Sequence, residues 1–175
     1  MPRRKISLTP DFAEEASRSF LNNDQMNQLL LDHLAPQAWR AKLPGIKGRT
    51  IADIFCHVHH MRCKWLRLSA PHLKQPKRVN RSRCTPRQIQ KALTESALLC
   101  AEMLAQALAP YGKVKFFLRD GWARSWTPGA EMLAYMIAHE AHHRGQVCML
   151  AHQLGFRLPV TVGAEMWNWE KLAKK

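Results

Sequence analysis

The sequence predicts an all-α protein, a four-helix bundle with long crossover connections and a short lead-in helix at the N-terminus. Apolar residues recur at spacings of three and four along four long segments, as in helices that bury one face. Capping threonines begin three of these segments, and proline or glycine follows their ends. Because 175 residues suffice for one buried core, we expect a single domain over residues 1–175.

Two helices are expected in the N-terminal part of the chain. Residues 10–21 form the short amphipathic lead-in helix. The first bundle helix then runs from Asn23 to Leu34. Asn22 or Asn23 is the expected cap, because an asparagine side chain accepts hydrogen bonds from the free amides of a first turn. Pro36 ends this helix.

The next two bundle helices have matching start signals. Residues 50–69 form the second bundle helix, with Thr50 and Asp53 spaced as in a capping box. The third begins at Thr85, has a proline in its first turn and has Gln88 at the capping-box position. It runs to about residue 108, before a proline and a glycine.

An extended connection precedes the last long helix. Between Gly112 and Trp126 the apolar residues show no helical period, so we expect a long crossover there. Thr127 and Pro128 then restart a helix with a cap and a first-turn proline. Gly155 ends it.

Two histidines lie one turn apart in this last helix. His139 and His143 are four residues apart and therefore project from the same face. They occupy positions in the apolar stripe that contains Met136 and Val147. A single core histidine is usually satisfied by hydrogen bonds. Two on one inward face favour a shared metal ion, because neutral imidazole is a common metal ligand.

A metal site needs a further ligand, which the second bundle helix offers. His57 lies three residues after Ile54 and one turn before Met61, on the apolar stripe of that helix. His59 and His60 are rotated away from the stripe and are expected at the surface or its rim. His57 is therefore the expected third ligand.

These residues carry a resemblance to a known family. The segments 54–62 and 139–146 are similar to the histidine-bearing segments of the DinB/YfiT-like family of metal-dependent four-helix-bundle proteins. The similarity continues through 113–116 and 167–169 and spans most of the chain after about Thr50. The resemblance implies that His57, His139 and His143 bind a divalent metal. Members of the family have been linked to thiol S-transfer and hydrolysis.

Glu140 follows the first histidine of the pair and raises an alternative. Residues 139–143 read His-Glu-x-x-His, the signature of zinc peptidases in which the glutamate activates a water. Such an enzyme needs a downstream ligand, for which Glu165 is the candidate. Because His57 already supplies an upstream ligand, we favour a supporting role for Glu140, which would orient an imidazole or contact a bound water.

The formal charge of +14 raises the question of a polyanionic partner. Lysines and arginines concentrate at residues 3–5, in the linker segment 74–83 and in the tail 171–175. No DNA-reading motif accompanies them, so we expect solvated basic loops and no specific nucleic-acid site.

Cysteine usage and hydropathy indicate the compartment. The five cysteines show no CxxC spacing, and we expect free thiols. No segment approaches the roughly 18 apolar residues that a membrane helix needs, and no signal peptide is recognised. We therefore expect a cytoplasmic protein with no membrane partner.

The expected function is that of a divalent-metal-binding protein, with zinc or nickel as the ion. Three histidines leave coordination positions open, which favours a metal-dependent thiol transferase or hydrolase acting on a small molecule. The alternative is a non-catalytic binding or stress-response module that the metal stabilises. A homodimer is the expected assembly.

Overall fold

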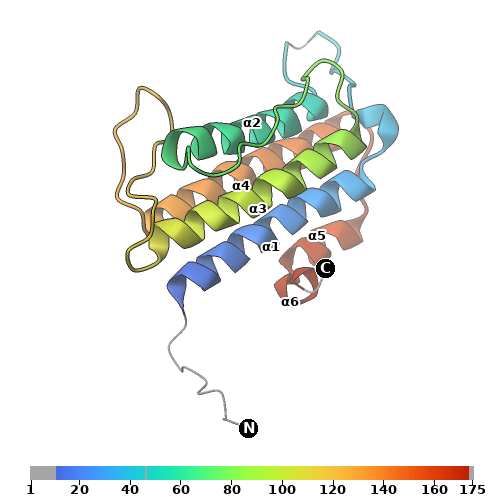
Figure 1. The fold of residues 1–175 in the computed structure, drawn as a ribbon. Coiled ribbons are helices and arrows are strands. Elements are labelled where there is room, and N and C mark those ends of the chain that lie inside the picture. Colours follow the sequence, from blue (N-terminus) through green and yellow to red (C-terminus); the bar gives the residue numbers. More distant parts are fainter. Residues whose placement is uncertain (1–10, 46, 174–175) are drawn as a thin grey trace.

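The computed structural model describes residues 11–45 and 47–173, and every regular element in these ranges is a helix. The prediction of an all-α helical bundle is confirmed (Figure 1). A 3₁₀ turn at Pro36–Ala38 follows the first helix. The α-helices are α1 (Phe12–His33), α2 (Ile51–Ser69), α3 (Pro86–Leu108), α4 (Ala130–Gln153), α5 (Val160–Trp167) and α6 (Trp169–Leu172).

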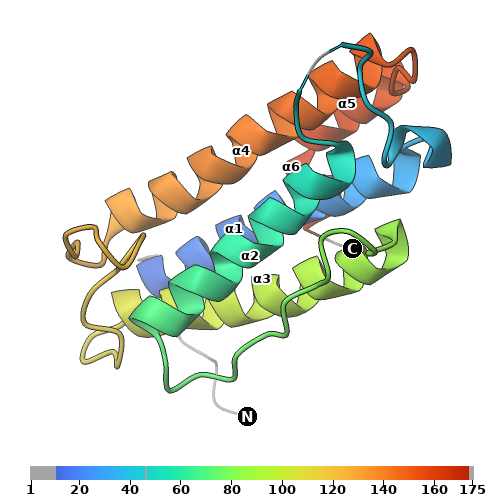
Figure 2. The ribbon, with the colours of Figure 1, turned by 90° about the horizontal axis from the view of Figure 1, so that it is seen from above.

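The four long helices form the bundle, and two short ones lie beside it. α1 and α2 each pack against both α3 and α4. α2 and α3 run in one direction, and α1 and α4 run in the other (Figure 2). Residues 70–85 must therefore return along the length of the bundle to reach the start of α3. α5 and α6 pack against α1.

This arrangement corrects the position of the crossover. The sequence indicated a crossover at residues 112–126, but that segment joins ends of α3 and α4 that lie at the same end of the bundle (Figure 1). A single antiparallel bridge between Phe117 and Trp126 explains its extended pattern. The crossover is the basic linker 70–85. Its polar sequence has no hydrophobic period, so the sequence did not indicate that this segment runs back along the bundle.

The predicted lead-in helix is wrong, because α1 is one continuous helix from Phe12 to His33. Asp11 caps it by accepting a hydrogen bond from the amide of Ala13 at 2.9 Å. Asn22 and Asn23 are buried inside the helix and do not cap it. The paired asparagines resembled a cap only in local sequence. Pro10 and the basic residues 3–5, 174 and 175 lie outside the described residues.

The starts of α2 and α3 were predicted correctly, and the start of α4 was not. Both predicted capping boxes form, at Thr50 and at Thr85. α4 begins at Ala130 after Gly129, with no side-chain cap, so Thr127 does not start it. Gly155 ends α4 as predicted, with a φ of 81°. The next amide, that of Phe156, donates to the Ala151 carbonyl at 2.9 Å, as in a Schellman motif.

The buried core extends along the whole bundle in two apolar clusters. One contains Leu30, Phe55 and Ile89, and the other contains Trp65 and Met103. Fully burying each such side chain contributes about 1.5–3 kcal/mol before conformational entropy is subtracted. Within the described residues, no helix is both long and apolar enough to cross a bilayer.

Candidate metal centre

Three histidines from two helices converge between α2 and α4. His57 comes from α2, and His139 and His143 come from consecutive turns of α4. Each offers one ring nitrogen, and the three nitrogens lie within 4.8 Å of one another. The ring centroids are separated by 5.3 Å for His57 and His139, 4.7 Å for His57 and His143, and 4.6 Å for His139 and His143. The structure therefore brings together the three predicted ligands, which we call the histidine cluster.

Aromatic residues enclose one side of the histidine cluster. The ring of Trp65 lies edge-on to His139 at a centroid distance of 5.3 Å, and Tyr135 lies 6.3 Å from His139. Trp65 is fully buried and belongs to the core. The position of His139 is thus fixed by packing on this side, and both His139 and His57 are partly buried.

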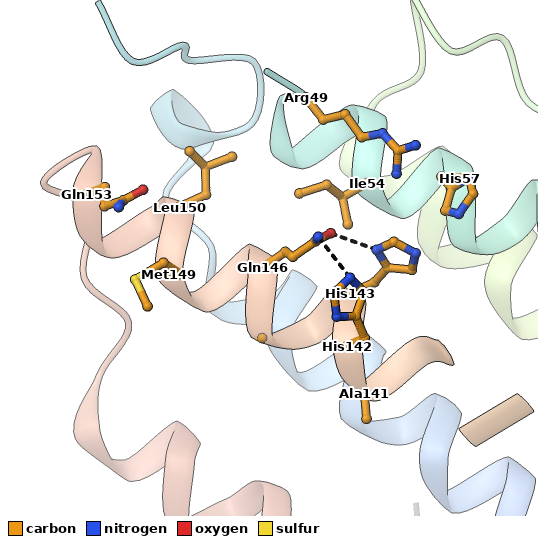
Figure 3. Close-up of a pocket in the computed structure, with 11 residues that line it drawn as sticks. Arg49, Ile54, His57, Ala141, His142, His143, Gln146, Met149, Leu150 and Gln153 are labelled. Atoms are coloured by element: carbon orange, nitrogen blue, oxygen red, sulfur yellow. Dashed lines mark hydrogen bonds between the residues drawn. The ribbon is translucent and has the colours of Figure 1, made fainter. Parts of the chain in front are cut away.

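Hydrogen bonds on α4 set the tautomer of His143 (Figure 3). Nδ1 of His143 donates to Oε1 of Gln146 at 2.7 Å. The amide nitrogen of Gln146 in turn donates to Nε2 of His142 at 3.0 Å. With its proton on Nδ1, His143 keeps the lone pair of Nε2 available. A carbonyl-type partner on the second ring nitrogen is the usual support of a metal-ligating histidine.

His139 has an unsatisfied ring nitrogen. Its Nδ1 is buried and has no hydrogen-bond partner among the described residues. Buried polar atoms are nearly always paired, so an unpaired one requires an explanation. Three imidazoles without a neighbouring carboxylate ligand form a donor set that suits zinc or nickel. The residues present therefore fit a divalent metal ion.

Burial lowers the pKa of all three imidazoles and so favours their neutral form. Burial, followed by the charge of His143, lowers the pKa of His57 to about 4. The same two causes lower the pKa of His139 to about 4. Burial also lowers the pKa of His143, although the hydrogen bond from its Nδ1 to Gln146 opposes this shift. Neutral imidazole is the form that binds metals.

Two members of the histidine cluster, His57 and His143, line a cavity of about 1050 Å³ (Figure 3). Its polar lining includes Arg49, from the residues just before α2, and Gln146. Its apolar lining includes Ile54, Met149 and Leu150. The side chain of Met149 is 61% exposed, so an apolar surface faces solvent beside the histidines. A cavity of this size accommodates a small organic molecule.

Glu140 points away from the histidine cluster, into the bundle. It is fully buried, and Oε2 accepts hydrogen bonds from Asn23 and Asn27, each at 2.8 Å. Arg62 donates to both carboxylate oxygens, in each case at 2.7 Å. Glu140 is not part of the group of potential metal-binding atoms. Its predicted contact with a bound water stays a prediction, and its four hydrogen bonds are to structural partners.

Glu140 belongs to a buried charge network that the sequence analysis missed. Arg62 is fully buried and also donates to Asp24 and to the Leu93 carbonyl, each at 2.8 Å. Arg144 of α4 donates to Asn27 at 3.3 Å, and its positive charge contributes to lowering the pKa of Glu140. The available signal was the position of Arg62, one turn after Val58 on the apolar stripe of α2.

The prediction that His59 lies at the surface or rim is wrong. His59 is fully buried and contacts the Ser96 hydroxyl at 3.1 Å and the Lys77 carbonyl at 2.9 Å. His60 is half-buried and contacts the Val79 carbonyl at 3.0 Å. The crossover covers this face of α2, and both histidines contact backbone carbonyls of the crossover.

The basic linker and the cysteines have structural partners. Arg81 pairs with Asp53 at 2.7 Å, and Lys74 pairs with Glu95 at 3.3 Å. All five cysteines are free thiols, as predicted. Cys56 and Cys84 bring their sulfur atoms to 3.0 Å, between α2 and the end of the crossover. Burial, and then the neighbouring Cys84, raises the pKa of the Cys56 thiol far above its usual range.

Comparison with known proteins identifies the family of the chain. A family model described as the DinB family matches residues 9–171. No curated protein and no solved structure matches the chain. The matched range covers all four bundle helices and the three residues of the histidine cluster.

Proposed function

The chain belongs to the DinB family, and on that premise we propose that it is a metal-dependent enzyme with one divalent ion on its histidine cluster. His57, His139 and His143 are the proposed ligands. Zinc and nickel are the proposed ions, because both bind imidazole nitrogen well. The substrate is a small molecule that enters the adjoining cavity.

One observation carries this proposal. The histidine cluster supplies three ligand atoms within 4.8 Å, and no fourth histidine, cysteine or carboxylate of the described residues joins it. Structural zinc sites are normally closed by four protein ligands, whereas catalytic sites keep a position open. His57 and His143 also line the cavity of about 1050 Å³, through which a substrate would reach the open position.

The residues around the histidine cluster have distinct roles in this proposal. A bound divalent ion acts as a Lewis acid and lowers the pKa of a water or thiol beside it. Gln146 holds His143 in the tautomer with a free Nε2. Trp65 and Tyr135 exclude water from one side of His139. Thiol transfer and hydrolysis are the two reaction types that such a site supports.

The non-catalytic alternative is less well supported. A metal ion that only joins two helices would be needed where the core is insufficient. This bundle has an extended apolar core and a buried charge network that already links α1, α2 and α4. Metal-independent folding is therefore part of the proposal.

The zinc-peptidase alternative requires Glu140 to act beside the metal. Its carboxylate is buried and engaged by Arg62, Asn23 and Asn27. Glu165, the downstream ligand that a peptidase would need, lies on α5 and outside the group of potential ligands. These contacts favour the three-histidine site. The proposal retains a cytoplasmic location and a homodimer as expectations.

Chelation tests the proposal. We expect the metal-free protein to keep its helical circular dichroism at room temperature and to lose only the stability that metal binding adds. At an ion concentration of 100 times Kd this contribution is about 2.7 kcal/mol. A screen of thiol-conjugation and hydrolysis reactions, each with and without metal, should yield a metal-dependent activity. Loss of helix on chelation would show a structural ion and contradict the proposal.

A further inference from the structure

Arg49 is the one basic residue of the cavity lining, apart from its histidines. It precedes Thr50, the cap of α2, and is exposed. Its guanidinium turns across the cavity toward His57 and His143 (Figure 3). The α2 capping box fixes the backbone that follows it, so Arg49 starts from a rigid position.

No carboxylate of the described residues neutralises Arg49. None of the residues that line the cavity is acidic. Asp53, one turn into α2, is occupied by Arg81 at 2.7 Å and by the Thr50 amide at 3.0 Å. The ion pairs found among the described residues do not include Arg49. The five N–H donors of its guanidinium therefore have no carboxylate partner among the described residues.

The guanidinium of Arg49 and the histidine cluster line the same cavity through Arg49, His57 and His143. A dication bound to the histidine cluster would be repelled by the positive charge of Arg49. An anion in the cavity would offset this repulsion, because it attracts both charges.

We propose that Arg49 is the anion-binding residue of the cavity and that the substrate is a small carboxylate. The planar guanidinium pairs with the carboxylate, for which its geometry is suited. The carbon chain of the substrate lies on Ile54, Leu150 and the exposed Met149. Its reacting group reaches the histidine cluster. This inference rests on the proposed function, because it places the carboxylate relative to the metal site.

Two small thiols that differ in one terminal group, a charged carboxylate or a neutral hydroxymethyl, test the inference. 3-Mercaptopropionate and 3-mercaptopropan-1-ol offer the same thiol, and only the first carries a carboxylate. Cobalt-loaded protein reports thiol binding through its visible absorption, and the cobalt content is measured first. We expect the wild-type protein to bind the carboxylate probe about tenfold more tightly, a value between those of exposed ion pairs and charge-assisted hydrogen bonds.

Arg49→Gln should abolish this preference and leave the cobalt content intact. Arg157→Gln is the matched control, because Arg157 is exposed and lines a different cavity. Arg157→Gln should keep the preference. Equal binding of both probes to the wild type, or a preference that survives in Arg49→Gln, would overturn the inference and leave the metal site standing. Failure to bind cobalt, or binding of cobalt with neither probe, would refute the proposed function and the inference together.

Discussion

α2 and α4 contribute residues to two polar clusters of the bundle, the charge network and the histidine cluster. The two clusters differ in whether their polar side chains form hydrogen bonds within the cluster. In the charge network, Arg62, Glu140 and Asp24 are buried, and Arg62 donates hydrogen bonds to both carboxylates. In the histidine cluster, the rings converge without hydrogen bonds between them, and Nδ1 of His139 has no partner. Glu140 directly follows His139, so adjacent residues of α4 enter different clusters.

This difference is what we expect if the charge network has a structural role and the histidine cluster binds a ligand. Burial opposes the ionisation of Glu140, but the charge and hydrogen bonds of Arg62, with the hydrogen bond of Asn27, together outweigh burial and lower the pKa of the carboxyl. Burial likewise opposes the charge of Arg62, but Glu140 and Asp24 together outweigh burial and raise the pKa of the guanidinium. The buried charges of Arg62, Glu140 and Asp24 compensate one another, although Oδ1 of Asn23, whose amide donates to Glu140, has no partner among the described residues. Under the proposed function, the histidine cluster takes its ligand from outside the chain. We therefore expect the charge network to stabilise the fold and the histidine cluster to bind the metal ion.

The largest effect is expected from breaking the charge network. Arg62→Ala leaves Glu140 and Asp24 buried without their cation, so we expect a loss of about 3–5 kcal/mol in the free energy of unfolding. Urea denaturation of metal-free protein measures it. A loss below about 1 kcal/mol would show that the network does not stabilise the bundle.

Glu140→Gln probes the network without a change in side-chain volume. We expect a loss of about 1.5–3 kcal/mol, the scale of hydrogen bonds to a charged group, with nearly unchanged metal content. Denaturation and elemental analysis of the same preparation give both values. Unchanged stability with loss of metal or of a protease activity would instead assign Glu140 to the metal site.

A smaller effect is expected from Gln146, which acts through His143. Gln146→Leu removes the acceptor of His143 Nδ1, so we expect metal affinity to fall by about tenfold to a hundredfold. Gln153→Leu, an exposed change on the same helix and in the same cavity, is the control. Competition with a chromophoric chelator measures both. Equal affinities of the two variants would show that Gln146 does not position His143.

The smallest effect is expected from an ion pair outside both clusters. Asp120 pairs with Lys64 at 2.6 Å, and that hydrogen bond is the main cause that lowers the pKa of the carboxyl below its usual 3.8, against the opposing effect of burial. Because this ion pair is partly exposed, Asp120→Asn should cost less than about 1 kcal/mol at neutral pH.

The sign of the pH dependence follows from the lowered pKa of Asp120. A carboxyl with a lowered pKa stabilises the fold above its unfolded pKa, and this contribution disappears as the pH falls through the folded value. The stability difference between wild type and Asp120→Asn should therefore be full at pH 6 and vanish as the pH falls below 3.8. A pH-independent difference in urea denaturation would contradict this account.

The sequence predicted correctly those features that depend on residues close together in the chain. The capping boxes at Thr50 and Thr85 predicted two helix starts, because the partners lie within four residues. The spacing of His139 and His143 predicted their common face, and the stripe of α2 selected His57. These positions depend on helical period alone.

Prediction failed where a distant partner decided the outcome. Asn23 resembles a cap in sequence, but its side-chain amide donates to Glu140, 117 residues away. His59 resembles a rim residue until the crossover covers it and its ring contacts the Lys77 carbonyl. Arg62 is buried because Asp24 and Glu140 come from two other helices. Single-helix periodicity contains none of these pairings.

Metal content tests the central claim most directly, that the histidine cluster is a binding site. Purified wild-type protein, loaded with zinc or nickel and freed of excess ion, should contain one ion per chain. His57→Ala should lose most of this metal at neutral pH, and His152→Ala, an exposed change on α4, should retain it. Full metal occupancy in His57→Ala would contradict the assignment of His57 and with it the three-histidine site.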